Sequence, residues 1–195
     1  MSRHARWAAC CVLMLAGIGF STADVVPESW EFEVYGGLGD SGFDGLDEDL
    51  VVGLRAGFNV TEHFNLSASV GYFSTEEEIS ELTFTGDVEF TDTYIDLSAM
   101  LHLIPDKPVN PQIFAGIGYS FVSVEAELTG PGGTLPSSVN GEDDSLTAHG
   151  GAGLRIDLGS RVYLNGQIRL RWYEARDEDE TATEYTLGLG FKLGS

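Results

Sequence analysis

Large apolar residues alternate with small or polar ones along most of the chain after residue 29. The last such stretch, residues 185–193, places five large apolar residues at every second position: Tyr185, Leu187, Leu189, Phe191 and Leu193. Successive side chains of a β-strand point to opposite faces, so this pattern is typical of a strand with one apolar and one small or polar face.

Eight segments share this alternation and predict eight strands. They are residues 30–39, 50–60, 64–73, 93–103, 111–122, 146–158, 161–173 and 185–193. The long connections 40–49, 74–92, 123–145 and 174–184 alternate with the short turns 61–63, 104–110 and 159–160. Residues 82–90 are themselves β-prone, so we expect that the strands flanking 74–92 can extend into it as a hairpin.

The last strand has no successor to pair with, and an open apolar edge recruits other chains. We therefore expect it to pair with residues 30–39, antiparallel because the strand number is even. The prediction is an all-β fold: an eight-stranded antiparallel up-and-down transmembrane β-barrel with short periplasmic turns and long acidic extracellular loops.

The composition of the polar face indicates that it points inward. It is rich in Gly and Ser, and an eight-stranded barrel has an interior barely wide enough for side chains. The apolar face carries aromatic residues near strand ends, as expected at membrane interfaces. A soluble periplasmic barrel or sandwich, with the apolar face inside, is the alternative. The charged residues of the polar face are Glu31, Glu33, Asp96, Asp157, Arg55, Arg155, Arg169, Arg171 and Lys192.

The N-terminal residues predict a secretory signal peptide. Arg3, His4 and Arg6 precede an apolar run over residues 7–20, and small residues end at Ala23. The run is shorter than the ~20 residues of a spanning helix, which disfavours a membrane anchor. We predict a signal peptide over 1–23 and a barrel domain over 24–195. Both cysteines lie in the signal peptide, so we expect no disulfide.

The chain carries a formal net charge of −21. Such acidity excludes nucleic acid as a partner, because phosphate contacts need a basic surface. The acidic residues gather in the long connections, where they either solvate the surface or bind divalent cations loosely. No EF-hand spacing occurs, so we name no metal ligands. The acidic residues are Asp44, Asp47, Glu48, Asp49, Glu76, Glu77, Glu78, Glu81, Glu142, Asp143, Asp144, Asp177, Glu178, Asp179 and Glu180.

The histidines after the predicted signal peptide do not indicate a catalytic site. His63 lies in a short turn, while His102 and His149 fall on the inward set. Ser98 and Asp96 share the face of His102, but a lipid-modifying enzyme needs its Ser–His–carboxylate set on the lipid-facing surface. We therefore assign no catalytic, cofactor-binding or metal-binding residue and expect a non-enzymatic protein.

The whole pattern, together with residues 111–119 (PQIFAGIGY), resembles the small outer-membrane β-barrel proteins of the OmpA-type transmembrane domain, OmpX and opacity-protein group. Gly188, Phe191 and Leu193 are similar to the C-terminal signal recognised by the barrel-assembly machinery, although Gly194 and Ser195 follow instead of a terminal aromatic.

This resemblance implies a cell outer-membrane location, contact with outer-membrane lipid and lipopolysaccharide, assembly by that machinery, and a monomer. It also implies a structural or surface-interaction role through the acidic loops. The alternatives are a narrow pore or a barrel that binds a small or apolar solute, and then a lipid A-modifying enzyme.

Overall fold

The computed structural model describes residues 25–40, 49–81, 84–130, 133–134, 139–173 and 180–193. Eight long strands and one two-residue strand make up its secondary structure. They are β1 (Ser29–Asp40), β2 (Asp49–Asn59), β3 (Phe64–Glu81), β4 (Phe84–His102), β5 (Val109–Gly130), β6 (Gly133–Thr134), β7 (Val139–Asp157), β8 (Val162–Tyr173) and β9 (Glu180–Leu193). These ranges contain no helix long and apolar enough to cross a membrane.

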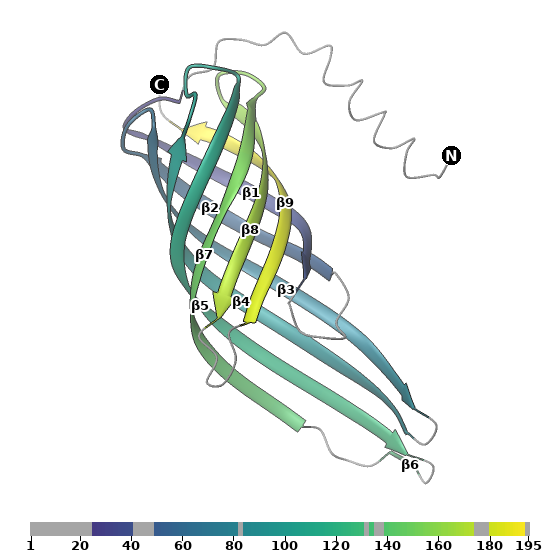
Figure 1. The fold of residues 1–195 in the computed structure, drawn as a ribbon. Helices are drawn as coiled ribbons and strands as arrows, with labels where there is room; N and C mark the ends of the chain where they lie inside the picture. The colour runs from purple at the N-terminus through teal and green to yellow at the C-terminus, as the bar shows by residue number, and fades with distance from the viewer. Residues whose placement is uncertain are drawn as a thin grey trace, which may run out of the picture.

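The eight long strands form a closed barrel, as predicted (Figure 1). Each pairs antiparallel with its neighbours in the chain, and β9 returns to pair antiparallel with β1. In that closing ladder Trp30 lies opposite Leu193 and Leu38 lies opposite Tyr185. The last strand therefore has a partner on both sides, and no edge of the closed barrel is left open.

The polar face points inward and the apolar face outward, which confirms the predicted inversion. Leu187 on the outer face is 63% exposed, whereas Arg155 and Asp96 on the inner face are 1% and 0% exposed. This arrangement rules out the soluble alternative, because a water-facing barrel buries its apolar face instead.

Short turns join the strands at one end, which we name the turn end. Thr61 closes the β2–β3 turn by accepting hydrogen bonds at its Oγ1 from the backbone N–H groups of His63 and Phe64. The N–H of Leu158 donates to Val162 across the β7–β8 turn. All three predicted short turns lie at this end.

Residues 25–28 cross the turn end. The Val25 N–H donates to Pro105 O at 3.2 Å, in the β4–β5 turn, and the Glu28 N–H donates to Asn59 O at 2.7 Å, at the end of β2. Glu28 adopts a left-handed φ of 56°, which redirects the chain into β1. Since β5 stands opposite β1 in the ring, this segment spans the mouth and buries the Val25 side chain.

The predicted long connections proved to be strand over much of their length. β3 and β4 pair as far as Glu81 and Phe84, which confirms the expected hairpin. The prediction for residues 123–145 was wrong, because β5 and β7 stay paired out to Ala126 and Val139. Residues 180–184 likewise belong to β9 and not to a loop. The predicted signal peptide and residues 41–48 and 174–179 lie outside the described residues.

At the opposite end, which we name the hairpin end, β3, β4, β5 and β7 run past the other strands (Figure 1). The last pair between β2 and β3 is Val51 with Phe73, and the last between β7 and β8 is Thr147 with Tyr173. Beyond these pairs the four strands form an open sheet, which we name the protruding sheet. Within the described residues, its edges are residues 74–81 of β3 and 139–146 of β7.

Candidate functional site

The interior of the barrel is the densest collection of polar groups in the described structure. Every second side chain of each of the eight long strands points inward, so these polar side chains meet in one enclosed space. Buried charges are costly unless they are paired and hydrogen-bonded, so their pairing decides what the interior can do. The buried charged residues are Glu31, Glu33, Asp92, Asp96, Asp157, Glu184, Arg55, Arg155, Arg169, Arg171 and Lys192.

A first cluster lies near the turn end. Arg155 donates from Nη1 to Glu31 at 2.9 Å and from Nε to Asp157 at 3.1 Å. Lys192 Nζ lies 2.9 Å from the same Asp157 oxygen. Asn59 donates to the other Glu31 oxygen at 2.9 Å. The two carboxylates, Glu31 and Asp157, and the two cationic side chains, Arg155 and Lys192, balance each other in charge.

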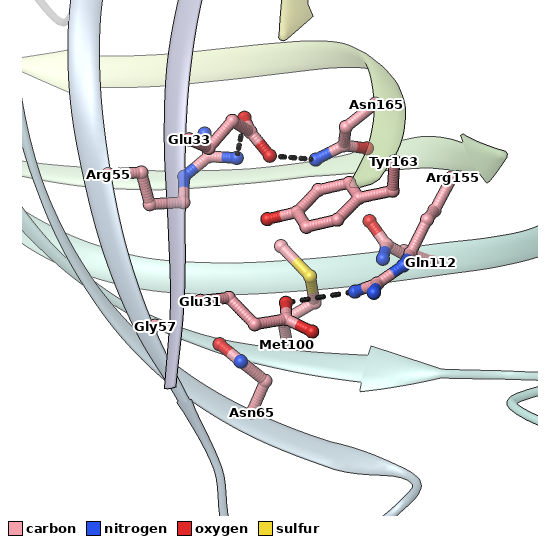
Figure 2. A pocket seen from close by; sticks show the side chains of 10 residues that line it. All are labelled: Glu31, Glu33, Arg55, Gly57, Asn65, Met100, Gln112, Arg155, Tyr163 and Asn165. Carbon is pink, nitrogen blue, oxygen red and sulfur yellow. Dashed lines mark hydrogen bonds and ion pairs between the residues drawn. The ribbon is translucent and has the colours of Figure 1, made fainter. Parts of the chain in front are cut away.

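A second cluster occupies the middle of the interior. Arg55 donates to Glu33 at 2.8 Å and to the Gln167 side-chain oxygen at 2.7 Å. Asn165 donates to the second Glu33 oxygen at 2.9 Å. Figure 2 shows Arg55, Glu33 and Asn165 of this cluster beside the Glu31–Arg155 pair.

The cavity between these two clusters is about 10 Å³, which is close to the roughly 10–15 Å³ that one water molecule needs (Figure 2). Three polar atoms on its lining residues have no hydrogen-bond partner: Arg155 Nη2, Gln112 Oε1 and Asn165 Oδ1. A single water fits this set of one donor and two acceptors. A space of this size is too small to pass or hold a solute.

A third cluster lies toward the hairpin end. Asp96 accepts from Arg169 at 2.9 Å and from Arg171 at 2.9 and 3.0 Å. Glu184 accepts from Arg171 Nε at 3.1 Å, and its other oxygen lies 3.6 Å from Arg169. Both arginines are shared by both carboxylates, so the cluster forms one network.

Each of three interior tyrosine rings lies against a glycine of the neighbouring strand and near an arginine. The guanidinium carbon of Arg171 lies 3.7 Å from the Tyr94 ring centroid, and a methyl group at Gly71 would overlap the same ring. Each glycine is the direct cross-strand partner of its tyrosine. The three trios are Gly53–Tyr35–Arg55, Gly71–Tyr94–Arg171 and Gly190–Tyr163–Arg155.

The histidines lie where the sequence placed them. His63 is exposed in the β2–β3 turn, while His102 and His149 are buried inside. His102 Nδ1 lies 3.1 Å from the side-chain nitrogens of both Asn110 and Gln112, which hold it near the turn end. These amides can only donate to that nitrogen, so it acts as the acceptor.

The structure brings Ser98 and Asp96 to His149, although the sequence grouped them with His102. Ser98 Oγ lies 2.8 Å from His149 Nε2, and His149 Nδ1 lies 3.6 Å from Asp96 Oδ1. The order serine–histidine–aspartate is that of a hydrolase triad. Here both arginines of the third cluster engage the aspartate, and the serine faces the filled interior instead of the lipid-facing surface that a lipid-modifying enzyme needs.

The acidic connections contribute no metal centre to the described structure. Within the described ranges, no group of three His, Cys, Asp or Glu side chains is placed to hold a metal ion. Asp44, Asp47, Glu48 and residues 177–179 lie outside those ranges. Glu76, Glu77, Glu78 and Glu81 belong by their backbone to β3, and Glu142, Asp143 and Asp144 belong to β7.

On the described part of the outer face, the exposed large side chains are mainly apolar. Its exposed aromatic residues lie toward the two ends of the barrel, and they form two rings that suit the interfaces of a bilayer. Trp30 and Phe58 pack together at the turn end, with centroids 5.1 Å apart, and Tyr119 packs on Phe121 at the hairpin end, also at 5.1 Å. These positions match the predicted aromatic girdles.

A family model for the outer membrane protein beta-barrel domain matches residues 10–192. Among curated proteins, none matches the sequence. The solved N-terminal β-barrel domain of Pseudomonas aeruginosa OprF is similar, with a TM-score of 0.57 and 18% identity, over 86% of this chain and 98% of that one.

Two further solved structures are similar. The outer membrane protein OprG from Pseudomonas aeruginosa has a TM-score of 0.57 and 12% identity, over 87% of this chain and 98% of that one. Ail, the attachment invasion locus protein of Yersinia pestis, has a TM-score of 0.53 and 14% identity, over 86% of this chain and 100% of that one. At these identities the likeness concerns the fold.

Proposed function

Because the chain belongs to the family of outer membrane protein β-barrel domains and is located in the outer membrane, we propose that it is a non-enzymatic surface protein that binds partners through its protruding sheet. Barrels of this kind keep short turns in the periplasm and long connections outside the cell. The turn end is then periplasmic, and the protruding sheet projects from the cell surface.

The observation that supports this role is the pair of unpaired edges on the protruding sheet. β3 has no described neighbour beside residues 74–81, and β7 has none beside residues 139–146. An exposed strand edge offers a row of backbone donors and acceptors to an extended segment of another chain. Backbone pairing supplies affinity there, and the side chains supply selectivity.

The charge of these edges favours a cationic partner. The sequence of residues 74–81 holds Glu76, Glu77, Glu78 and Glu81, and residues 139–146 hold three more acids, with no Lys or Arg in either segment. Ail has been solved in complex with sucrose octasulfate, a heparin analogue and therefore a polyanion. We expect the opposite preference in this chain, because like charges repel at an interface.

The closed interior argues against the pore and the solute-binding barrel. Three ion-pair clusters and the tyrosine rings fill it, and the cavity between the first two clusters is about 10 Å³. The enzyme alternative is weak for a different reason: the Ser98–His149–Asp96 group faces this filled space and not the lipid.

Shortening the β3–β4 hairpin tests the proposal. Thr75 and Phe90 are paired, so an Asn-Gly turn can replace residues 76–89. We expect proteoliposomes with the shortened protein to bind a lysine-rich extended peptide at least about tenfold more weakly than the wild type. An oligoglutamate peptide of equal length should bind neither protein.

A matched variant, E76Q/E77Q/E78Q, separates backbone pairing from charge attraction. It keeps the strand and removes three charges, so we expect intermediate binding with a weaker salt dependence. Undiminished binding by the shortened protein contradicts the proposed role of this hairpin.

A further inference from the structure

The buried charges of the interior do not balance. Among the described residues, six buried carboxylates face five buried cationic side chains. Five of the carboxylates have an ion pair within 4 Å: Glu31, Glu33, Asp96, Asp157 and Glu184. The sixth, Asp92, has none among the described residues, although it is only 1% exposed. A buried carboxylate without a counter-charge is costly, so Asp92 needs an explanation.

Asp92 lies where the closed barrel gives way to the protruding sheet. It is paired with Phe73 on β3 and with Val122 on β5. Arg171, a cation of the nearby third cluster, is already engaged by Asp96 and Glu184. Asp92 is thus the outermost buried acid, and it has apolar residues as cross-strand neighbours on both sides.

Hydrogen bonding leaves one Asp92 oxygen free. Ser120 Oγ donates to Oδ2 at 3.2 Å and Tyr173 OH donates to the same atom at 2.9 Å, whereas Oδ1 has no partner. Two donors on one oxygen suit an ionised carboxylate. A proton on Oδ1 would become a buried donor without an acceptor, so protonation does not resolve the geometry.

A second free oxygen lies close by in the ladder. Ser145 Oγ is buried and has no hydrogen-bond partner, and Ser145 is the direct cross-strand partner of Ser120. Ser120 therefore links the two residues: its hydroxyl donates to Asp92 Oδ2, and its cross-strand partner on β7 is Ser145. Oxygens that serve as ligands of one ion stand farther apart than hydrogen-bonded oxygens do, and both can remain without a mutual hydrogen bond.

We propose that Asp92 and Ser145 hold a hard cation, such as Ca²⁺, at the outer mouth of the barrel, with water completing its coordination. Carboxylate oxygens are the ligands that such ions prefer, and a serine hydroxyl can supply a further neutral oxygen. The strongly acidic outer segments of the sequence raise the local cation concentration. With one carboxylate, the affinity belongs in the weak range of extracellular calcium sites, roughly 10⁻⁴–10⁻³ M.

The test measures urea unfolding of the full-length folded protein in lipid vesicles, with and without Ca²⁺, at an ionic strength held constant with choline chloride. Ca²⁺ should raise the unfolding midpoint of the wild type, because it binds the folded state. D92N keeps the size of the side chain and removes its charge, so its midpoint should not move with Ca²⁺.

D144N is the matched control, because Asp144 is an exposed carboxylate at the same end of β7. It should keep the full Ca²⁺ response. S145A removes one ligand without touching the carboxylate, and it should raise the Ca²⁺ concentration for half-maximal stabilisation several-fold. This second variant also keeps the test decisive if D92N fails to fold.

Two results overturn the proposal. An equal response of D92N and the wild type would place Ca²⁺ binding elsewhere in the acidic segments. A wild type that does not respond at all would mean that Asp92 and Ser145 hold no Ca²⁺. Neither result bears on the role proposed for the sheet edges, which the peptide-binding assay tests separately.

Discussion

At the scale of single residues, the interior depends on contacts that leave no room for change. The three tyrosine rings occupy space that Gly53, Gly71 and Gly190 leave open, and the guanidinium group of an arginine lies near each ring. A one-residue slip in register would turn these tyrosines toward the lipid. The trios therefore specify the register of three strand pairs as well as filling the barrel.

Gly71→Ala tests this packing. The added methyl group would overlap the Tyr94 ring, and Arg171, whose guanidinium carbon lies 3.7 Å from the ring centroid, restricts where the ring can move. We expect a loss of about 1–3 kcal/mol in the free energy of unfolding, measured by urea titration in lipid vesicles. Gly166→Ala is the control, since nothing lies within 4 Å of its added methyl group. Equal losses in both variants would contradict the role of the trio.

Arg155→Met tests the pairing of buried charges. The change leaves Glu31 and Asp157 without their shared arginine, and breaking a buried pair on one side costs about 3–5 kcal/mol. The same urea titration measures it. Arg161→Met, at an exposed position of the β7–β8 turn, should change the stability little. If both variants unfold alike, the first cluster does not stabilise the fold.

At the scale of the strands, the sequence predicted the elements that lie in the membrane and missed what lies beyond it. Each strand has one face toward the bilayer and one toward the polar interior. Apolar and polar residues therefore alternate along its sequence, and this alternation predicts the strand. A sheet that extends beyond the bilayer no longer has lipid on one face, so alternation need not mark its strands. Residues 123–130 and 139–145 consequently read as a loop, although they pair in β5 and β7.

The candidate site was predictable only in part, for a related reason. Alternation placed His149, Ser98 and Asp96 on the inner face, but it carries no information about which inner residues meet across the barrel. The Ser98–His149 contact depends on the register of β4, β5 and β7 together. The trios had a weak signal, namely glycine and tyrosine at inward positions of neighbouring strands.

The closing strand offers the clearest test of the face assignment. Leu189 points to the lipid and is 41% exposed, whereas Thr186 lies on the inward set of β9. Leu189→Lys should cost about 2–4 kcal/mol near the bilayer midplane and reduce the fraction that inserts into vesicles. Thr186→Lys should insert better, as judged by heat-modifiable gel mobility. Equal insertion of the two variants would mean that the faces of β9 are assigned wrongly.

At the scale of the whole molecule, the two ends are built for different tasks. The turn end is sealed by residues 25–28, which tie Glu28 to Asn59 and Val25 to Pro105 across the mouth. The hairpin end opens into a sheet whose edges are unpaired within the described residues. Between them the ion-pair clusters fill the interior. We therefore expect the molecule to be closed to transport, and among the described residues it presents unpaired backbone edges at the hairpin end.

Conductance across a planar bilayer tests this closure and identifies what produces it. The wild type should show no stepwise conductance, because ion pairs fill the interior and the cavity between the first two clusters is only about 10 Å³. Deleting residues 25–28 removes the seal at the turn end but leaves the Arg155–Glu31 and Arg55–Glu33 pairs in place. The deletion variant should therefore stay closed as well, since the barrier extends through the interior and is not a lid.

If only the deletion variant conducts, residues 25–28 are the barrier and the clusters leave a continuous path. If the wild type conducts, the interior opens often enough for ions to pass. The pore then explains the fold better than the closed barrel does.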